Sequence, residues 1–165
     1  MRYLNKIVFI NSAAIRYSEV QLDGNIHLIG TQGVGKSTIL RAILFFYNAD
    51  TQRLGIPVEK KSYQDYYFPY ADSSIIYEVA REDGWFTVLS YKTMNRICYR
   101  FIASPYRPDL FIDEEGAPYP SDRIRSVLDK NGIKYSGAIS TYEEYRNILY
   151  GNSDNKRDRK STRLN

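Results

Sequence analysis

A glycine-rich segment that ends in a lysine and two hydroxyl residues is the part of this sequence whose residue types fit a definite chemistry. The stretch GTQGVGKS, residues 30–37, follows the pattern Gly-x-x-x-x-Gly-Lys-Ser of phosphate-binding loops. In such a loop the backbone N–H groups curl around a phosphate chain, and side chains at the closest approach would collide with it. Gly30, Gly33 and Gly35 lack those side chains. The segment therefore predicts a nucleotide-binding site.

The polar residues at the end of this segment have separate expected roles. Lys36 would reach the β- and γ-phosphates of ATP and is the expected catalytic residue, and the Ser37 hydroxyl would coordinate Mg²⁺. Thr38 would donate a hydrogen bond to the α-phosphate. Asn11 and Ser12 are open to two interpretations, a contact to the ribose or phosphates and an ordinary turn at a strand end. The predicted residues that bind ATP and Mg²⁺ are Asn11, Ser12, Gly30, Thr31, Gln32, Gly33, Val34, Gly35, Lys36, Ser37 and Thr38.

The elements on either side of the loop are those that a phosphate site requires. Residues 25–30, NIHLIG, predict a short buried strand that leads into the loop. From Ser37 onward the apolar residues recur at three- and four-residue steps, which is the period of an amphipathic helix. We expect the inward face of this helix to consist of Ile39, Leu40, Ile43, Leu44 and Tyr47.

The remaining pattern predicts a mixed α/β lobe. Strands are expected over 6–10 and 15–24, and an antiparallel meander over 75–82, 85–92 and 96–103. Residues 51–74 show no clear period, so we expect an ordered but irregular excursion whose aromatic cluster, residues 62–70, packs onto the sheet. A surface that stacks on DNA or contacts a partner is the alternative for that cluster.

Two helices are expected near the end of the chain. Ser121 can cap the first, whose inward face carries Ile124, Val127 and Leu128 and which ends at Gly132. The sequence TYEE, residues 141–144, has the spacing of a capping box. The helix that starts there should carry Tyr145, Ile148 and Leu149 inward.

The composition is that of an ordinary globular protein, with 43% apolar and 25% charged residues among 165. The apolar runs are too short to cross a bilayer, so no membrane partner is expected. Cys98 is the single cysteine, which excludes an intrachain disulfide and fits a cytoplasmic location. We interpret Cys98 as a small strand residue. One histidine and one cysteine supply neither a Cys/His metal set nor a Ser-His-Asp triad.

The last eight residues, DRKSTRLN (158–165), resemble the translation of a common sequencing adapter. We therefore expect residues 1–157 to be an incomplete N-terminal lobe and residues 158–165 to be a non-native tail. A genuine basic, disordered tail is the alternative. The formal net charge of +4 includes three basic residues and one acidic residue from this tail, so the charge carries no argument for nucleic-acid binding.

The order of strand, turn, strand, loop and helix resembles the N-terminal ATPase head of the structural-maintenance-of-chromosomes (SMC) class. The stretches INSAAIRYSEVQL (10–22) and NIHLIGTQGVGKSTILRAILFF (25–46) carry the resemblance. The sequence is also similar to recombination ATPases and to bacterial SMC-like plasmid-defence ATPases, which are relatives of the SMC class. The chain departs from the usual pattern at Gln32, where Asn is common, and at Val34, where Ser or Ala is common. The stretch TYEEYRNILYG (141–151) is a weaker match to the plasmid-defence branch.

This resemblance implies an ABC-type P-loop head, in which ATP is hydrolysed only when two heads enclose it. The Walker B carboxylates and the signature motif of such proteins lie in a C-terminal half-head beyond a long coiled coil. The implied partners are therefore that half-head, a second head, DNA and accessory subunits. We interpret DLFIDEEG, residues 109–116, as a turn rather than as a Walker B strand. The lobe alone should bind ATP without turning it over.

A self-contained P-loop enzyme, such as a small kinase or a GTPase that does not act on DNA, is the other hypothesis. A kinase of that kind builds its lid and acceptor site from further parallel strands, whereas this chain turns to antiparallel hairpins. The Asn-Lys-x-Asp sequence that reads guanine is absent. The residue that senses the γ-phosphate, usually a glutamine, has no secure position in this sequence.

Overall fold

Five antiparallel strands form the centre of the computed structural model, which describes residues 3–22, 35–48, 63–94 and 96–150. The strands lie in the order β2-β1-β3-β4-β5. Their bounds are β1 Tyr3–Ser12, β2 Ile15–Gln21, β3 Ser74–Arg81, β4 Gly84–Thr93 and β5 Arg96–Ile102. The helices are α1 Lys36–Asn48, α2 Tyr63–Tyr67, α3 Ser121–Lys130 and α4 Tyr142–Tyr150, with the short 3-10 helix η2 at Pro108–Leu110. The predicted mixed α/β class and antiparallel meander are confirmed. The predicted strand over 25–30 lies outside the described residues.

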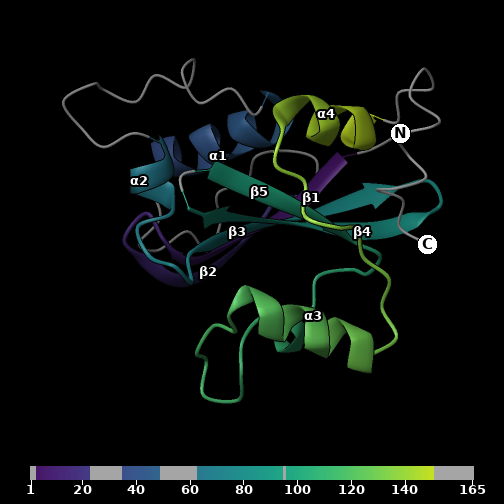
Figure 1. Ribbon diagram of the computed structural model, residues 1–165. Coiled ribbons are helices and arrows are strands. Elements are labelled where there is room, and N and C mark those ends of the chain that lie inside the picture. The colour runs from purple at the N-terminus through teal and green to yellow at the C-terminus, as the bar shows by residue number, and fades with distance from the viewer. Residues whose placement is uncertain (1–2, 23–34, 49–62, 95, 151–165) are drawn as a thin grey trace.

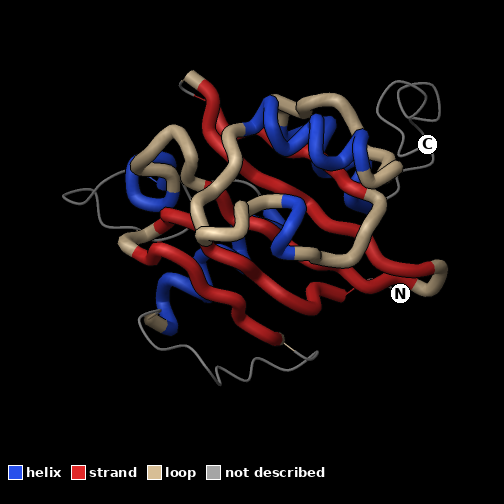
Figure 2. The backbone as a smooth tube through the Cα atoms, turned by 90° about the horizontal axis from the view of Figure 1, so that it is seen from below, coloured by secondary structure: helices blue, strands red, loops and turns tan. Residues whose placement is uncertain are grey.

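The sheet is buried on both faces. In β1, Ile7 and Phe9 join one apolar cluster, and the alternating Val8 and Ile10 join another. The helices α1, α2 and α4 cover the first face, and α3 with η2 covers the second (Figure 1). Figure 2 views the sheet from the side of α3. Because β1 and β3 are buried on both sides, their sequences are nearly continuous apolar runs, which the sequence pattern predicts as strands.

The expected inward face of α1 is partly wrong. Ile39 is buried and Ile43 is half-buried, as expected, but Leu40 and Leu44 are each 44% exposed and Tyr47 is 40% exposed. The residues that pack on the sheet in their place are Ala42, Phe45 and Phe46. Both sets recur at helical spacing, so α1 carries two apolar stripes and periodicity alone could not choose between them. The larger aromatic stripe faces the sheet. The exposed stripe comprises Leu40, Leu44 and Tyr47.

Tyrosine hydroxyls fasten α1 to its surroundings. Four of them donate to main-chain carbonyls along the helix, and they come from α2, β3 and α4. The pairs are Tyr67 with Thr38 (2.7 Å), Tyr77 with Ala42 (3.0 Å), Tyr145 with Phe46 (2.5 Å) and Tyr150 with Tyr47 (2.8 Å). The last two acceptors lie in the final turn, where carbonyls lack helical partners. The tyrosines therefore satisfy backbone groups as well as filling the core.

The described part of the expected irregular excursion is a short helix, α2, because its aromatic residues pack on α1 and the sheet. The rings of Tyr67 and Tyr63 stack with centroids 4.3 Å apart, and Tyr63 stacks on Phe45 at 4.4 Å. Tyr99 and Tyr145 stack at 4.1 Å further along the same core cluster. The prediction that this aromatic cluster packs onto the sheet is confirmed for Tyr63, Tyr67 and Phe68, which are buried.

The last two helices begin and end close to the expected residues. Ser121 does not cap α3, because Pro120 occupies the N-cap position and Ser121 is already helical. Gly132, with φ of 65°, follows the end of α3 as expected. At α4 the backbone N–H of Glu144 donates to Thr141 Oγ1 over 3.3 Å, which confirms the predicted N-terminal cap.

The acidic stretch at 109–116 is a turn, as predicted. Asp113 accepts hydrogen bonds from the backbone N–H groups of Glu115 and Ala117, both at 2.9 Å. Its carboxylate therefore holds a loop. Within the described residues, no helix has the length and apolar content needed to cross a membrane.

Candidate functional site

The helix α1 begins at Lys36, directly after the glycine-rich segment. Its first helical hydrogen bond runs from Ile39 N to Gly35 O, 3.2 Å, so the N–H groups of Lys36, Ser37 and Thr38 have no acceptor within the helix. The first turn contains no acidic residue, and Lys36 and Ser37 are exposed. Free N–H groups and the positive end of the helix dipole suit an anion. The predicted residues Gly30, Thr31, Gln32, Gly33 and Val34 lie outside the described residues.

Two neighbouring tyrosines of α2 hold the first turn of α1. The Tyr66 hydroxyl lies 3.1 Å from Thr38 Oγ1, and the Tyr67 hydroxyl donates to the Thr38 carbonyl over 2.7 Å. Any phosphate contact from Thr38 would therefore share its hydroxyl with Tyr66. Sequence analysis missed both tyrosines as neighbours of this turn. The only signal for them was the aromatic cluster, which does not say what the hydroxyls bind.

Asn11 and Ser12 are the last residues of β1, and a residue that follows α2 bonds to Asn11. Asn11 has a positive φ of 45°, and its carbonyl accepts a short hydrogen bond from Ser73 Oγ. Ser12 is fully buried, and its Oγ has no hydrogen-bond partner within the part of the chain that the structure describes. A buried hydroxyl without a partner costs about 1–3 kcal/mol. A buried hydroxyl without a described partner, such as that of Ser12, is unusual in a protein core. Asn11, in contrast, is hydrogen-bonded to the segment that follows α2.

These contacts place the separated candidates at one end of the sheet. The segment 66–73 bonds Thr38 at one end and Asn11 at the other. Figure 1 shows α2 beside α1, at the end of the sheet where β1 turns into β2. The structure therefore connects Thr38 and Asn11 through a segment that the sequence pattern did not include in the predicted site.

A hollow of about 730 Å³ lies at the C-terminal end of α1, away from Lys36 and Ser37. It is lined by the last turns of α1 and α4 and by the β3–β4 turn, with Leu4, Tyr47, Arg81 and Leu149 among its residues. None of the predicted site residues lines it. Its size alone does not identify it as the functional site, because the residues suited to phosphate chemistry lie elsewhere.

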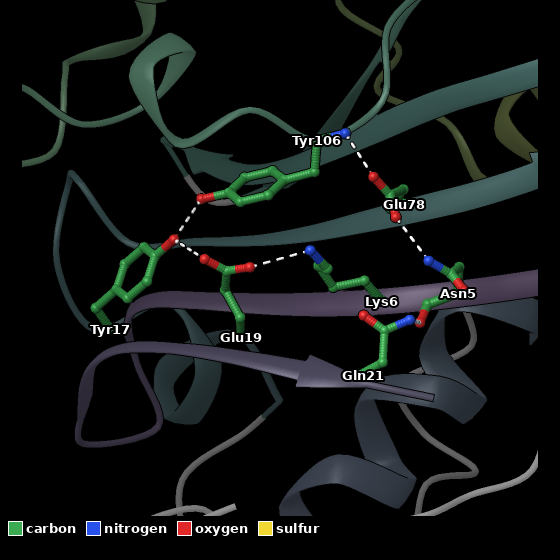
Figure 3. A network of polar contacts seen from close by, with 7 residues as sticks. All are labelled: Asn5, Lys6, Tyr17, Glu19, Gln21, Glu78 and Tyr106. Atoms are coloured by element: carbon green, nitrogen blue, oxygen red, sulfur yellow. Dashed lines mark hydrogen bonds and ion pairs between the residues drawn. The ribbon is translucent and has the colours of Figure 1, made fainter. Parts of the chain in front are cut away.

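A polar network on the other face of the sheet is a structural connection (Figure 3). The buried carboxylate of Glu78 accepts hydrogen bonds from Asn5 Nδ2 at 2.8 Å and from Tyr106 N at 2.7 Å. The Tyr17 and Tyr106 hydroxyls lie 2.7 Å apart. Burial, followed by contacts with Glu19, raises the pKa of Tyr17 to about 12. The network joins β2, β1 and β3 to the loop after β5, and its phenols remain protonated at neutral pH.

Neither the single cysteine nor a cluster of the described acidic residues forms a further candidate site. Cys98 is buried in β5, and burial raises the pKa of its thiol, which fits the interpretation as a small strand residue. Across the described ranges, no cluster of three or more His, Cys, Asp or Glu side chains could hold a metal ion. The Ser37 hydroxyl, exposed at the start of α1, remains the predicted Mg²⁺ ligand.

Comparison with known proteins identifies one family for nearly the whole chain. Residues 11–164 match the family model described as "Protein of unknown function (DUF3584)". No curated protein and no solved structure matches the chain.

Proposed function

The chain belongs to the DUF3584 family, and we propose that it binds ATP as the N-terminal lobe of an SMC-like ATPase. The start of α1 carries this proposal. A glycine-rich segment with phosphate-loop spacing leads directly into a helix whose first N–H groups have no acceptor within the helix and whose first turn lacks acidic residues. A triphosphate at that position would gain hydrogen bonds from the backbone and a favourable interaction with the helix dipole.

The side chains at this helix start suit the ligand. Lys36 is exposed beside the free N–H groups and would pair with the β- and γ-phosphates. Ser37 would hold a Mg²⁺ ion that neutralises phosphate charge when it is bound. Tyr66 and Tyr67 would keep the first turn of α1 in place while the ligand binds, because they hold Thr38 through its side chain and its carbonyl.

The exposed stripe of α1 supports the view that this lobe works with another one. Leu40, Leu44 and Tyr47 form an apolar row at helical spacing, although the opposite face of α1 already packs on the sheet. We propose that the C-terminal half-head covers this row and supplies the carboxylates needed for hydrolysis. Turnover would then follow engagement of two heads, in DNA maintenance or plasmid defence as the resemblance implies. That setting rests on the resemblance alone.

The test is binding of ATP with Mg²⁺ to the full 165-residue chain, measured by calorimetry. We expect weak binding that Lys36→Ala abolishes, because the substitution removes the only side-chain charge proposed to face the β- and γ-phosphates. Lys130→Ala is the matched control, since Lys130 is an exposed lysine on α3 at the other face of the sheet. Equal binding by the Lys36→Ala variant, or no binding by the unaltered chain, would overturn the proposal.

Phosphate release by the same preparation separates the two hypotheses drawn from the sequence. The lobe alone should release none above the background of buffer with ATP. Turnover by the chain alone, lost in Lys36→Ala, would instead support a self-contained P-loop enzyme.

A further inference from the structure

A second hollow lies beside the end of β1, against the turn that follows α2. Its volume is about 510 Å³, and it is lined by Asn11, Tyr70, Ala71 and Asp72. The hollow is shallow and largely open to solvent, so a group bound there would stay partly exposed. The lining combines an aromatic ring, a carboxylate and an amide around one small residue, and the family description assigns none of these to a ligand.

The turn that carries Tyr70 is held by main-chain and side-chain hydrogen bonds. Ser73 N donates to the Tyr70 carbonyl over 3.1 Å, and Tyr70 N donates to Ser73 Oγ over 2.9 Å. Ser73 Oγ in turn donates to the carbonyl of Asn11. These bonds fix the position of the turn against the strand end. The Tyr70 side chain is nevertheless 64% exposed, and none of the described aromatic rings stacks on it.

The same segment connects the hollow to the start of α1. Tyr66 and Tyr67, four and three residues before Tyr70, bond to Thr38. Phe68, which lies between Tyr67 and Tyr70, is fully buried in the core cluster beneath α1. The backbone of Tyr70 and the first turn of α1 are therefore held at the two ends of one short, anchored segment.

We propose that this hollow receives the nucleoside part of the nucleotide whose phosphates lie at the start of α1. The proposal rests on the proposed function and extends it by assigning the base and ribose contacts. The ring of Tyr70 stacks on the base, because an exposed aromatic face suits any planar heterocycle. The Asp72 carboxylate accepts hydrogen bonds from the ribose hydroxyls, and Asn11 also lines the hollow.

The test compares ATP with inorganic tripolyphosphate, each with Mg²⁺, on the full chain and its variants. Tyr70→Ala should weaken ATP binding about tenfold, the loss expected for one base–aromatic stack, and should leave tripolyphosphate binding unchanged. Tyr70→Phe should bind ATP like the unaltered chain because the ring face is retained. Asp72→Asn should weaken ATP binding and leave tripolyphosphate binding unaffected. Tyr3→Ala, at another exposed tyrosine (43% exposed) at the start of β1, is the matched control and should change neither.

The outcomes separate this inference from the proposal on which it rests. Binding of both ligands with no effect of Tyr70→Ala on ATP would overturn the nucleoside site and leave the phosphate site standing. An equal loss for ATP and tripolyphosphate would also overturn it, because that pattern reports damage to the phosphate site. Binding of neither ligand to the unaltered chain would overturn both.

Discussion

The Tyr67 hydroxyl donates to the main-chain carbonyl of Thr38 over 2.7 Å, and this bond is buried. It joins α2 to the first turn of α1, the turn that follows the glycine-rich segment. Because the side chain of the neighbouring Tyr66 meets the Thr38 hydroxyl as well, the helix start is held at two points. The position of this helix terminus thus depends on a five-residue helix that lies later in the sequence.

Removal of this hydroxyl should destabilise the fold. Tyr67→Phe keeps the ring in its stack with Tyr63 and deletes only the hydrogen bond, so we expect the free energy of unfolding to fall by about 1 kcal/mol. Urea unfolding followed by circular dichroism measures the change. Tyr66→Phe is the control, since that hydroxyl is only partly buried and should cost less. Equal stability of Tyr67→Phe and the unaltered chain would show that the bond contributes nothing net.

The two apolar stripes of α1 should respond differently to truncation. Phe45→Ala removes a fully buried ring and should cost about 3–5 kcal/mol. Leu44→Ala, one residue earlier, should cost less than about 1 kcal/mol because Leu44 is largely exposed. Denaturant unfolding of the two variants in parallel measures both values. A large loss in Leu44→Ala would mean that the exposed stripe is covered within the chain itself.

The buried carboxylate of Glu78 should be sensitive even to its nearest isostere. Both of its partners, Asn5 Nδ2 and Tyr106 N, are donors, so the amide of Glu78→Gln would turn an N–H group toward another donor. We expect a loss of about 1–3 kcal/mol in the free energy of unfolding. Glu19→Gln, which weakens a partly exposed ion pair with Lys6, should cost less than about 1 kcal/mol. The prediction fails if the two variants unfold at the same urea concentration.

Alkaline pH should unfold the protein. Burial raises the pKa values of Tyr63 and Tyr77 above that of a free phenol, and it raises the pKa of Tyr17 to about 12. The unfolded chain loses these phenolic protons near pH 10 while the folded chain retains them. The stability they contribute is therefore fully present below about pH 10 and is lost as the pH rises toward the folded-state values. Urea unfolding at several alkaline pH values measures the slope.

Tyrosinate absorbance provides the independent readout for this prediction. The exposed tyrosines should titrate smoothly near pH 10, whereas the buried ones should ionise only as the far-ultraviolet circular dichroism signal is lost. A smooth titration of all sixteen tyrosines with the fold intact would contradict it.

Much of the fold could be predicted because its signals are local. The hairpin strands β3, β4 and β5 appear as β-rich runs separated by turn residues, and the cap of α4 follows from the spacing of Thr141 and Glu144. The start of α1 was predicted within one residue, because the end of the glycine-rich loop marks it. The same spacing predicts Lys36 and Ser37 as ligands of a phosphate and its metal ion, and these two roles stay predictions.

Only the tertiary structure decided which stripe of α1 faces the sheet and what surrounds its first turn. Leu40 and Phe45 have equally good helical spacing, and the choice between them depends on the rings of Tyr63 and Tyr99, which come from distant segments. The hydrogen bond of Ser73 to Asn11 joins residues 62 positions apart. Sequence periodicity reports which side chains can share a face. Burial and hydrogen bonding depend on what the rest of the chain places against that face.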